Sequence, residues 1–143
     1  MNGLKLLVTT GLLTFVVGCQ TTPPKPVQFD WPTQAKSVSP YSAENKGIDL
    51  YGQNGQAIYT AAAGEVLYVG NALKDYGNMV IIKHNDEYRT AYAHNATIIV
   101  KEGDKVAANQ KIATMGNNQS KKPALHFEIR KNGQPQDPTN YLK

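Results

Sequence analysis

Three short segments of this chain carry side chains suited to metal or acid–base chemistry. Asp49 lies in Asn-Lys-Gly-Ile-Asp-Leu (residues 45–50), His94 ends a Tyr-Ala-His run, and His126 lies in Ala-Leu-His-Phe-Glu-Ile-Arg (residues 124–130). Histidine nitrogens and carboxylate oxygens are, with cysteine thiolates, the ligands that zinc takes in proteins. If the fold brings them together, these residues form a candidate zinc or proton-transfer site.

Each residue alone has an ordinary structural explanation. A lone aspartate is most often a turn or capping residue, and a histidine on a strand is most often hydrogen-bonded inside the fold. His84, the remaining histidine, follows an apolar run and is interpreted as a surface residue at a strand end. Only the joint pattern of Asp49, His94 and His126 favours a functional site.

The elements that must position these residues are predicted to be β-strands. Runs rich in β-branched and aromatic residues alternate with glycines, and no window shows a sustained helical period. The expected strands occupy residues 57–61, 65–70, 78–84, 88–94, 96–100, 111–116 and 124–130. Short strands about ten residues apart are typical of sandwiches and barrels. We therefore expect an all-β fold, a compact β-sandwich or barrel-sandwich of short strands with little helix.

The N-terminus predicts export and lipid attachment. The apolar run Leu6–Val17 has 12 residues, which is too short to span a bilayer but suits a signal-peptide core. It leads into Gly18 and Cys19, which resemble the lipobox of bacterial lipoproteins. The resemblance implies cleavage before Cys19 and acylation of its thiol, and Gln20 resembles outer-membrane sorting. The alternative is an ordinary secretory signal with an incidental cysteine, although the only cysteine of an exported chain cannot form an internal disulfide.

These features divide the chain into three parts. Residues 1–18 form the signal peptide, residues 19–28 the acylated cysteine and a stiff Pro-rich tether, and residues 29–143 one folded domain. Removing Lys5 with the signal peptide lowers the net charge from +4 to +3. This mild charge suits contact with an anionic polymer and is not the signature of a nucleic-acid-binding protein.

The three segments, with Asp-Tyr-Gly-Asn at residues 75–78, resemble the LytM or lysostaphin-like family of zinc peptidoglycan endopeptidases. That family has His-x-Gly-x-Asp early, Tyr-Ala-His in the middle and His-x-His-Phe-Glu near the end. The resemblance covers about residues 31–143 and implies that the domain is of LytM type. In active members the early His, the Asp and the last His bind zinc, while the other two histidines assist the bound water.

This sequence departs from the family pattern at two positions. Asn45 replaces the early histidine and Ala124 replaces the first histidine of His-x-His, so Asp49, His94 and His126 remain as vestiges. A catalytic zinc usually needs three protein ligands and one open position, and an amide is a poor zinc ligand. The resemblance thus implies a degenerate domain with no catalytic residues, no metal and no cofactor.

Within the family, the chain most resembles NlpD-type lipoproteins, whose degenerate domains bind and activate periplasmic N-acetylmuramoyl-L-alanine amidases during peptidoglycan remodelling and daughter-cell separation. The implied location is the outer membrane, with the domain facing the periplasm. The implied partners are an amidase and peptidoglycan, and not nucleic acid. The expected partner-binding groove consists of Asn45, Asp49, Tyr76, His94, Ala124 and His126.

Three alternatives stay open at this point. The first is a zinc endopeptidase in which Asp49, His94 and His126 hold the metal in an altered arrangement. The second is a non-catalytic scaffold that binds peptidoglycan without an enzyme partner. The third is a lipoyl or biotinyl carrier, suggested by the cadence of residues 102–116, but no Met-Lys-Met-like triplet is present.

Overall fold

The computed structural model describes residues 18–19, 23 and 26–143. The predicted signal-peptide core and half of the predicted tether therefore lie outside the described residues. Cys19 is described and is exposed. Within the described part of the chain, no helix combines the length and apolar character that crossing a bilayer requires.

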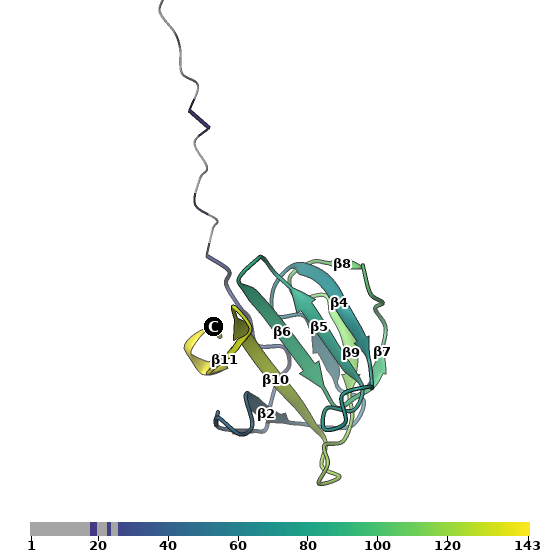
Figure 1. Ribbon diagram of the computed structural model, residues 1–143. Coiled ribbons are helices and arrows are strands. Elements are labelled where there is room, and N and C mark those ends of the chain that lie inside the picture. Colours follow the sequence, from purple (N-terminus) through teal and green to yellow (C-terminus); the bar gives the residue numbers. More distant parts are fainter. Residues whose placement is uncertain (1–17, 20–22, 24–25) are drawn as a thin grey trace, which may run out of the picture.

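The domain is built from two antiparallel sheets (Figure 1). The larger sheet has the strand order β1-β2-β10-β6-β5-β4-β8, with β11 paired to β10, and the smaller has the order β3-β9-β7. The strands are β1 (Ser37–Ser39), β2 (Ile48–Tyr51), β3 (Ala57–Tyr59), β4 (Gly64–Gly70), β5 (Met79–Lys83), β6 (Tyr88–Ala93), β7 (Asn95–Ile98), β8 (Lys105–Val106), β9 (Lys111–Met115), β10 (Ala124–Lys131) and β11 (Gln134–Gln136). A 3-10 turn, η1 (Pro138–Asn140), is the only helical element among the described residues.

The all-β prediction is confirmed, and each of the seven expected strands is present with slightly different ends. The strands missed by the sequence pattern are β1, β2, β8 and β11. They have two to four residues each, which is too short to display a period of two. Their pairing with longer neighbours, and not their own composition, makes them strands.

The core lies between the two sheets. Apolar side chains of the large sheet, such as Ile82 and Phe127, pack with those of the small sheet, such as Ile58 and Ile112, in one buried cluster. Tyr92 of β6 is fully buried within this cluster. Its hydroxyl accepts a hydrogen bond from the Ala61 N–H at 2.8 Å. This bond joins the middle of the large sheet to the loop that follows β3.

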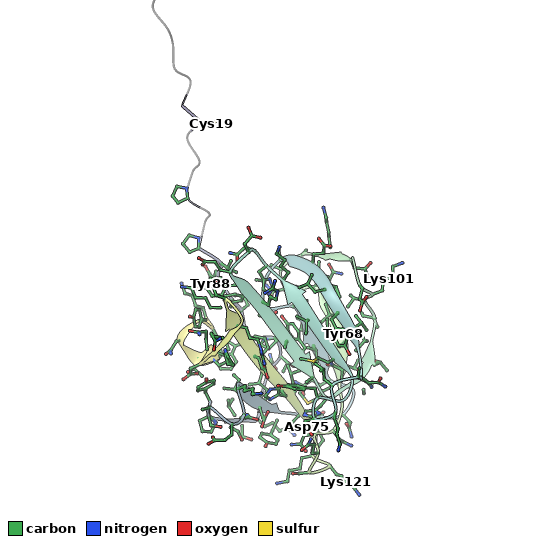
Figure 2. All side chains as sticks on the ribbon, viewed as in Figure 1. Cys19, Tyr68, Asp75, Tyr88, Lys101 and Lys121 are labelled. Carbon is green, nitrogen blue, oxygen red and sulfur yellow. The ribbon has the colours of Figure 1, made fainter. Side chains whose placement is uncertain are left out.

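The domain has two distinct ends along β6. Phe29, which follows the tether, is fully buried, and its ring centroid lies 5.6 Å from that of Tyr88 at the start of β6. The C-terminal residue also lies here, because the Lys143 N–H donates to the Phe29 carbonyl. His94 directly follows the other end of β6. Figure 2 shows Tyr88 near the tether, and Asp75 and Lys121 at the opposite end.

The interpretation of His84 as a surface residue needs correction. Its ring lies edge-on to Phe29, with centroids 5.3 Å apart, and its two nitrogens lie within hydrogen-bond distance of the Ala63 carbonyl and the Thr90 hydroxyl. Burial lowers the pKa of His84. The sequence pattern could not show this, because the contacts come from the tether end and from the loop after β3.

The Tyr92 hydroxyl provides a test of how the two sheets are joined. Replacing it in Tyr92→Phe leaves the buried Ala61 N–H without its partner, and an unsatisfied buried donor costs about 1–3 kcal/mol. We expect the free energy of unfolding, measured by urea denaturation, to fall by this amount. Tyr41→Phe is the matched control, since Tyr41 has no side-chain hydrogen bond among the described residues; an equal loss in both variants would contradict the assignment.

Candidate functional site

A groove of about 450 Å³ lies at the end of the domain away from the tether. It is formed where the start of β2, the loop before β5, the residue after β6 and the loop before β10 converge. The lining residues are Glu44, Asn45, Lys46, Asp49, Tyr51, Asp75, Tyr76, His94, Asn118, Gln119, Ser120 and His126. Asp75, labelled in Figure 2, marks this end of the molecule.

Strand register brings Asp49 and His126 together. β2 and β10 pair antiparallel with His126 directly opposite Asp49, so both side chains leave the same face of the sheet. Gly47 permits the close approach of the two strands, because a Cβ there would lie 2.3 Å from the Phe127 carbonyl oxygen. This contact explains why glycine stands two residues before Asp49.

His94 is held in the groove by a backbone conformation that few non-glycine residues adopt. Its φ is +62°, in the left-handed region where a side chain adds strain. Two backbone hydrogen bonds fix it there: its N–H donates to the Tyr76 carbonyl, and its carbonyl accepts from the Gly116 N–H. A Cβ at Gly116 would lie 2.5 Å from the same carbonyl. The strained backbone at His94 therefore places its imidazole in the groove.

His126 is clamped between two carboxylates. Its Nδ1 lies 2.8 Å from Asp49 Oδ1, and its Nε2 lies 2.9 Å from Glu128 Oε1. Glu128 is fully buried and also accepts hydrogen bonds from the Arg130 Nε at 2.7 Å and the Tyr76 hydroxyl at 3.0 Å. The result is a chain of alternating charges in which each buried group has a partner.

This arrangement favours the imidazolium form of His126. Although burial opposes a charge, hydrogen bonds to Asp49 and Glu128 and the charges of both carboxylates raise the pKa of His126 to about 9. Burial alone would raise the pKa of both carboxyl groups, but their bonds to His126 hold them below their ordinary values. At neutral pH both ring nitrogens therefore carry protons and donate them.

Such a set of side chains does not fit a catalytic zinc ion. A catalytic zinc usually takes three protein ligands, whereas here Asn45, whose neutral amide is a poor zinc ligand, lies beside Asp49 and His126. Asn45 turns its amide nitrogen toward Asp49 Oδ2 at 3.4 Å and the Gly47 carbonyl at 3.3 Å. Among the residues that the structure describes, no group of three His, Cys, Asp or Glu side chains converges as a metal site.

The other site residues predicted from the sequence divide between the groove and the core. Asn45, Asp49, Tyr76, His94 and His126 all line the groove. Ala124 shares the His126 face of β10 but does not line the groove, because it is buried, with 1% of its surface exposed. The His94 and His126 ring centroids lie 6.3 Å apart. Burial and the charge of His126 lower the pKa of His94, which leaves His94 a neutral imidazole.

Sequence reasoning missed several residues of this site. Glu128 and Arg130 follow His126 at spacings of two and four, so they share its face of β10. This alternation was available in the sequence and identifies the buried carboxylate. Gln119 donates to the Asp75 side chain at 3.2 Å and so links the two loops that flank the groove. No local pattern indicates that contact, because 44 residues separate the partners.

Comparisons with known proteins identify the family and several relatives of this chain. Residues 43–138 match the pattern of peptidase family M23. The chain is 52% identical over 115 residues to the murein hydrolase activator NlpD of Escherichia coli, covering 78% of this chain and 30% of that protein. It is 48% identical over 119 residues to the outer membrane antigenic lipoprotein B of Haemophilus influenzae, covering 81% of this chain and 29% of that protein. The chain thus spans about a third of the length of these curated relatives.

A solved structure shows the same fold. The crystal structure of a zinc-containing peptidase from Vibrio cholerae superposes with a TM-score of 0.70 at 29% identity, covering 77% of this chain and 39% of that one. The recognition of a LytM-type domain from the sequence is thereby confirmed, and the resemblance to NlpD-type lipoproteins with it.

The clamped histidine predicts a pH dependence of stability. Because the folded pKa of about 9 exceeds the ordinary value of 6.5, His126 stabilises the fold fully below about pH 6.5, and this stabilisation is lost as the pH rises through about 9. We expect the difference in free energy of unfolding between the native chain and His126→Gln to shrink between about pH 6 and pH 10.

His94→Gln is the control for this measurement. The pKa of His94 is lowered, so its contribution changes only in acid, as the pH falls below the ordinary histidine range. Urea denaturation across the pH series measures both variants. A His126→Gln difference that is constant with pH would show that His126 is neutral in the folded protein.

Proposed function

The chain belongs to peptidase family M23, and from this premise we propose that it is a non-catalytic member that binds and activates a periplasmic N-acetylmuramoyl-L-alanine amidase. The observation that carries the proposal is the clamped His126, whose two nitrogens donate to Asp49 and Glu128. The groove keeps Asp49 and His126, while Asn45 and Ala124 stand where the family pattern has histidines. A groove without hydrolytic chemistry remains suited to recognition.

The rate enhancement that zinc and the missing histidines would supply is large compared with what the remaining side chains of the groove can supply. Bound zinc lowers the pKa of water from 15.7 to about 7, and general acid–base help adds roughly 100- to 10,000-fold. Ala124 has only a methyl group where the family pattern has a histidine, and the Asn45 amide is engaged with Asp49 and Gly47. These substitutions act on the same reaction, so we infer that the domain does not cut peptide bonds.

Besides the charged side chains of Glu44, Lys46 and Asp75, the groove offers a partner several neutral hydrogen-bonding groups. His94 presents an imidazole, and Asn118, Gln119 and Ser120 present amide and hydroxyl groups along one side. The charges of the Asp49–His126–Glu128–Arg130 chain are satisfied internally. A partner segment therefore meets fixed dipoles without having to separate an ion pair. Fixed polar groups at the base of a concave site give orientation and specificity.

Activation follows from differential binding. An amidase that is closed most of the time opens when a partner binds its open form more tightly than its closed form. Moving such an enzyme from almost fully closed to almost fully open requires a preference of roughly 5.5 kcal/mol. The groove needs no catalytic group for this role, since the free energy comes from contacts made only with the open amidase.

The position of the groove suits an outer-membrane lipoprotein. The relatives named above include an outer membrane lipoprotein, and we propose acylation of Cys19 here as well. The ten residues from Cys19 to Phe29 reach at most about 35 Å when extended. Tyr88 lies at the end of the domain where the chain enters from the tether, and Asp75 of the groove lies at the opposite end (Figure 2). We propose that anchoring through Cys19 therefore leaves the groove facing away from the membrane.

The proposed function predicts stimulation of an amidase. Adding the full chain in detergent to several purified periplasmic amidases is expected to increase release of label from dye-labelled sacculi for at least one of them. Asn118→Ala and His94→Ala, which alter the groove, are expected to reduce that stimulation about tenfold or more, because central polar contacts of an interface commonly carry this much binding energy.

Ile99→Ala is the control, because Ile99 is exposed outside the groove. Dye release by the chain without any amidase would support the endopeptidase alternative. Pelleting with sacculi but no stimulation of any amidase would support the peptidoglycan-scaffold alternative. Either result would overturn the proposed function.

The proposed function also makes a prediction about zinc binding. The double variant Asn45→His with Ala124→His restores the histidines of the family pattern, and we expect its zinc affinity to exceed that of the native chain by at least about tenfold. Isothermal titration with zinc measures both proteins, and Asn45→Gln with Ala124→Val serves as the control pair. Stoichiometric, tight zinc binding by the native chain, abolished by His126→Ala, would contradict the account of the site.

A further inference from the structure

His84 lies outside the groove and has no part in the function proposed above. At the tether end of the domain, its ring contacts three separate segments: Phe29 where the chain enters, the loop between β3 and β4, and strand β6. We propose that His84 is an acid-sensitive latch, which holds the entry of the chain against the domain while its ring is neutral and releases it when the ring is protonated.

The entry of the chain, residues 29–31, is fastened to the loop between β3 and β4. Phe29 is fully buried, and the N–H of the next residue, Asp30, donates to the Ala61 carbonyl of that loop at 2.8 Å. Strand β3 holds the following part of the chain separately, because it donates an N–H to the Pro32 carbonyl at 2.8 Å. Residues 29–31 thus form a short unit that can open while the sheets stay folded.

His84 supports both Phe29 and the loop that holds the entry. Its ring meets the Phe29 ring edge-on, with centroids 5.3 Å apart, and its Nδ1 lies 2.8 Å from the Ala63 carbonyl oxygen. Glycine at position 64 leaves room for this approach, because a Cβ on Gly64 would lie 3.0 Å from the same nitrogen. The loop that accepts the Asp30 N–H is therefore itself held in place by His84.

The hydrogen bonds of the His84 ring assign its protonation state. A carbonyl oxygen only accepts, so Nδ1 carries the proton that it donates to Ala63. In the neutral ring Nε2 is then an acceptor, and the Thr90 hydroxyl donates to it at 2.7 Å. The Thr90 hydroxyl also lies 2.9 Å from that of Tyr92, which accepts from the Ala61 N–H. One neutral tautomer therefore satisfies both ring nitrogens and joins them to the buried network between the sheets.

Protonation of His84 disturbs this arrangement in two ways. Nε2 becomes a donor, so the Thr90 hydroxyl must redirect its only proton. The imidazolium charge is also partly shielded from water, and this burial is the main cause of the lowered pKa of His84. In the open state the ring returns to water and protonates more readily, so acid shifts the equilibrium toward opening.

No carboxylate compensates for the charge of a protonated His84. The titratable side chains on the surrounding segments are Asp30, Glu65, Lys83, Asp86, Glu87, Tyr88 and Tyr141. Asp86 pairs with Lys83 at 3.0 Å, and among the described residues neither these carboxylates nor the C-terminus forms an ion pair with His84. Phenols ordinarily titrate near pH 10 and carboxyl groups near pH 4, so an imidazole is the group that responds to mild acid here.

Release of the entry lengthens the tether. Three additional residues, 29–31, add about 10 Å of extended chain to the tether that precedes them. The latch itself does not depend on the proposed function. That its release moves the domain farther from a membrane rests on the proposed acylation of Cys19.

Amide hydrogen exchange of the full chain in detergent tests the latch. We expect the protection factor of the Asp30 N–H to fall at least about threefold from about pH 7.5 to about pH 5, because the open state gains the free energy of protonating His84. The Ile99 N–H, which donates to the Ile112 carbonyl at 3.0 Å, reports on the small sheet and is expected to change less.

Two histidine variants assign the effect to one ring. His84→Gln keeps a donor and an acceptor but does not titrate, so the protection factor of the Asp30 N–H is expected to stay constant with pH. His94→Gln removes another histidine and is expected to retain the pH dependence. An Asp30 protection factor that is constant with pH in the native chain, or that falls equally in His84→Gln, would overturn the proposal.

A measurement on the native chain decides the matter if His84→Gln does not fold. Nitrogen-15 NMR of labelled histidine at about pH 7.5 is expected to show a neutral His84 ring with its proton on Nδ1. A neutral ring with its proton on Nε2, or an imidazolium at this pH, would show that the latch is wrongly assigned.

Discussion

The site depends on one interaction, the double hydrogen bond of His126 to Asp49 and Glu128. A buried carboxylate such as Glu128 carries a large desolvation penalty unless cations or donors surround it. His126, Arg130 and Tyr76 supply those partners. The His126 imidazolium thus lies between the carboxylates of Asp49 and Glu128, and its positive charge and that of Arg130 balance their negative charges. Removing one member of such a chain leaves a buried charge unpaired.

The backbone around this interaction is arranged to hold it. The β2–β10 register sets His126 opposite Asp49, and Gly47 allows the strands to approach. The left-handed turn at His94 closes the groove from β6. The groups that these features position are bonded to one another. We therefore propose that this M23 scaffold serves as a recognition surface.

The sequence predicted the larger part of the fold because long strands display their own signal. The apolar run at residues 79–83 and the alternating run at residues 124–130 identify strands without tertiary information. The two-residue strand β8 and the contacts of His84 escaped prediction, since both exist only through partners distant in the chain. Asp49 and His126 could be assigned to one site from the family pattern alone. Glu128 could have been added to it from the period of two along β10.

The state of the His126 ring at neutral pH tests the central claim most directly. Nitrogen-15 NMR of selectively labelled histidine, recorded near neutral pH with and without equimolar zinc, distinguishes an imidazolium from a neutral or metal-bound ring. The account predicts that both His126 nitrogens are protonated and that zinc leaves their shifts unchanged. A neutral His126 with one nitrogen bound to zinc, together with cleavage of cross-linked wall peptides, would contradict it.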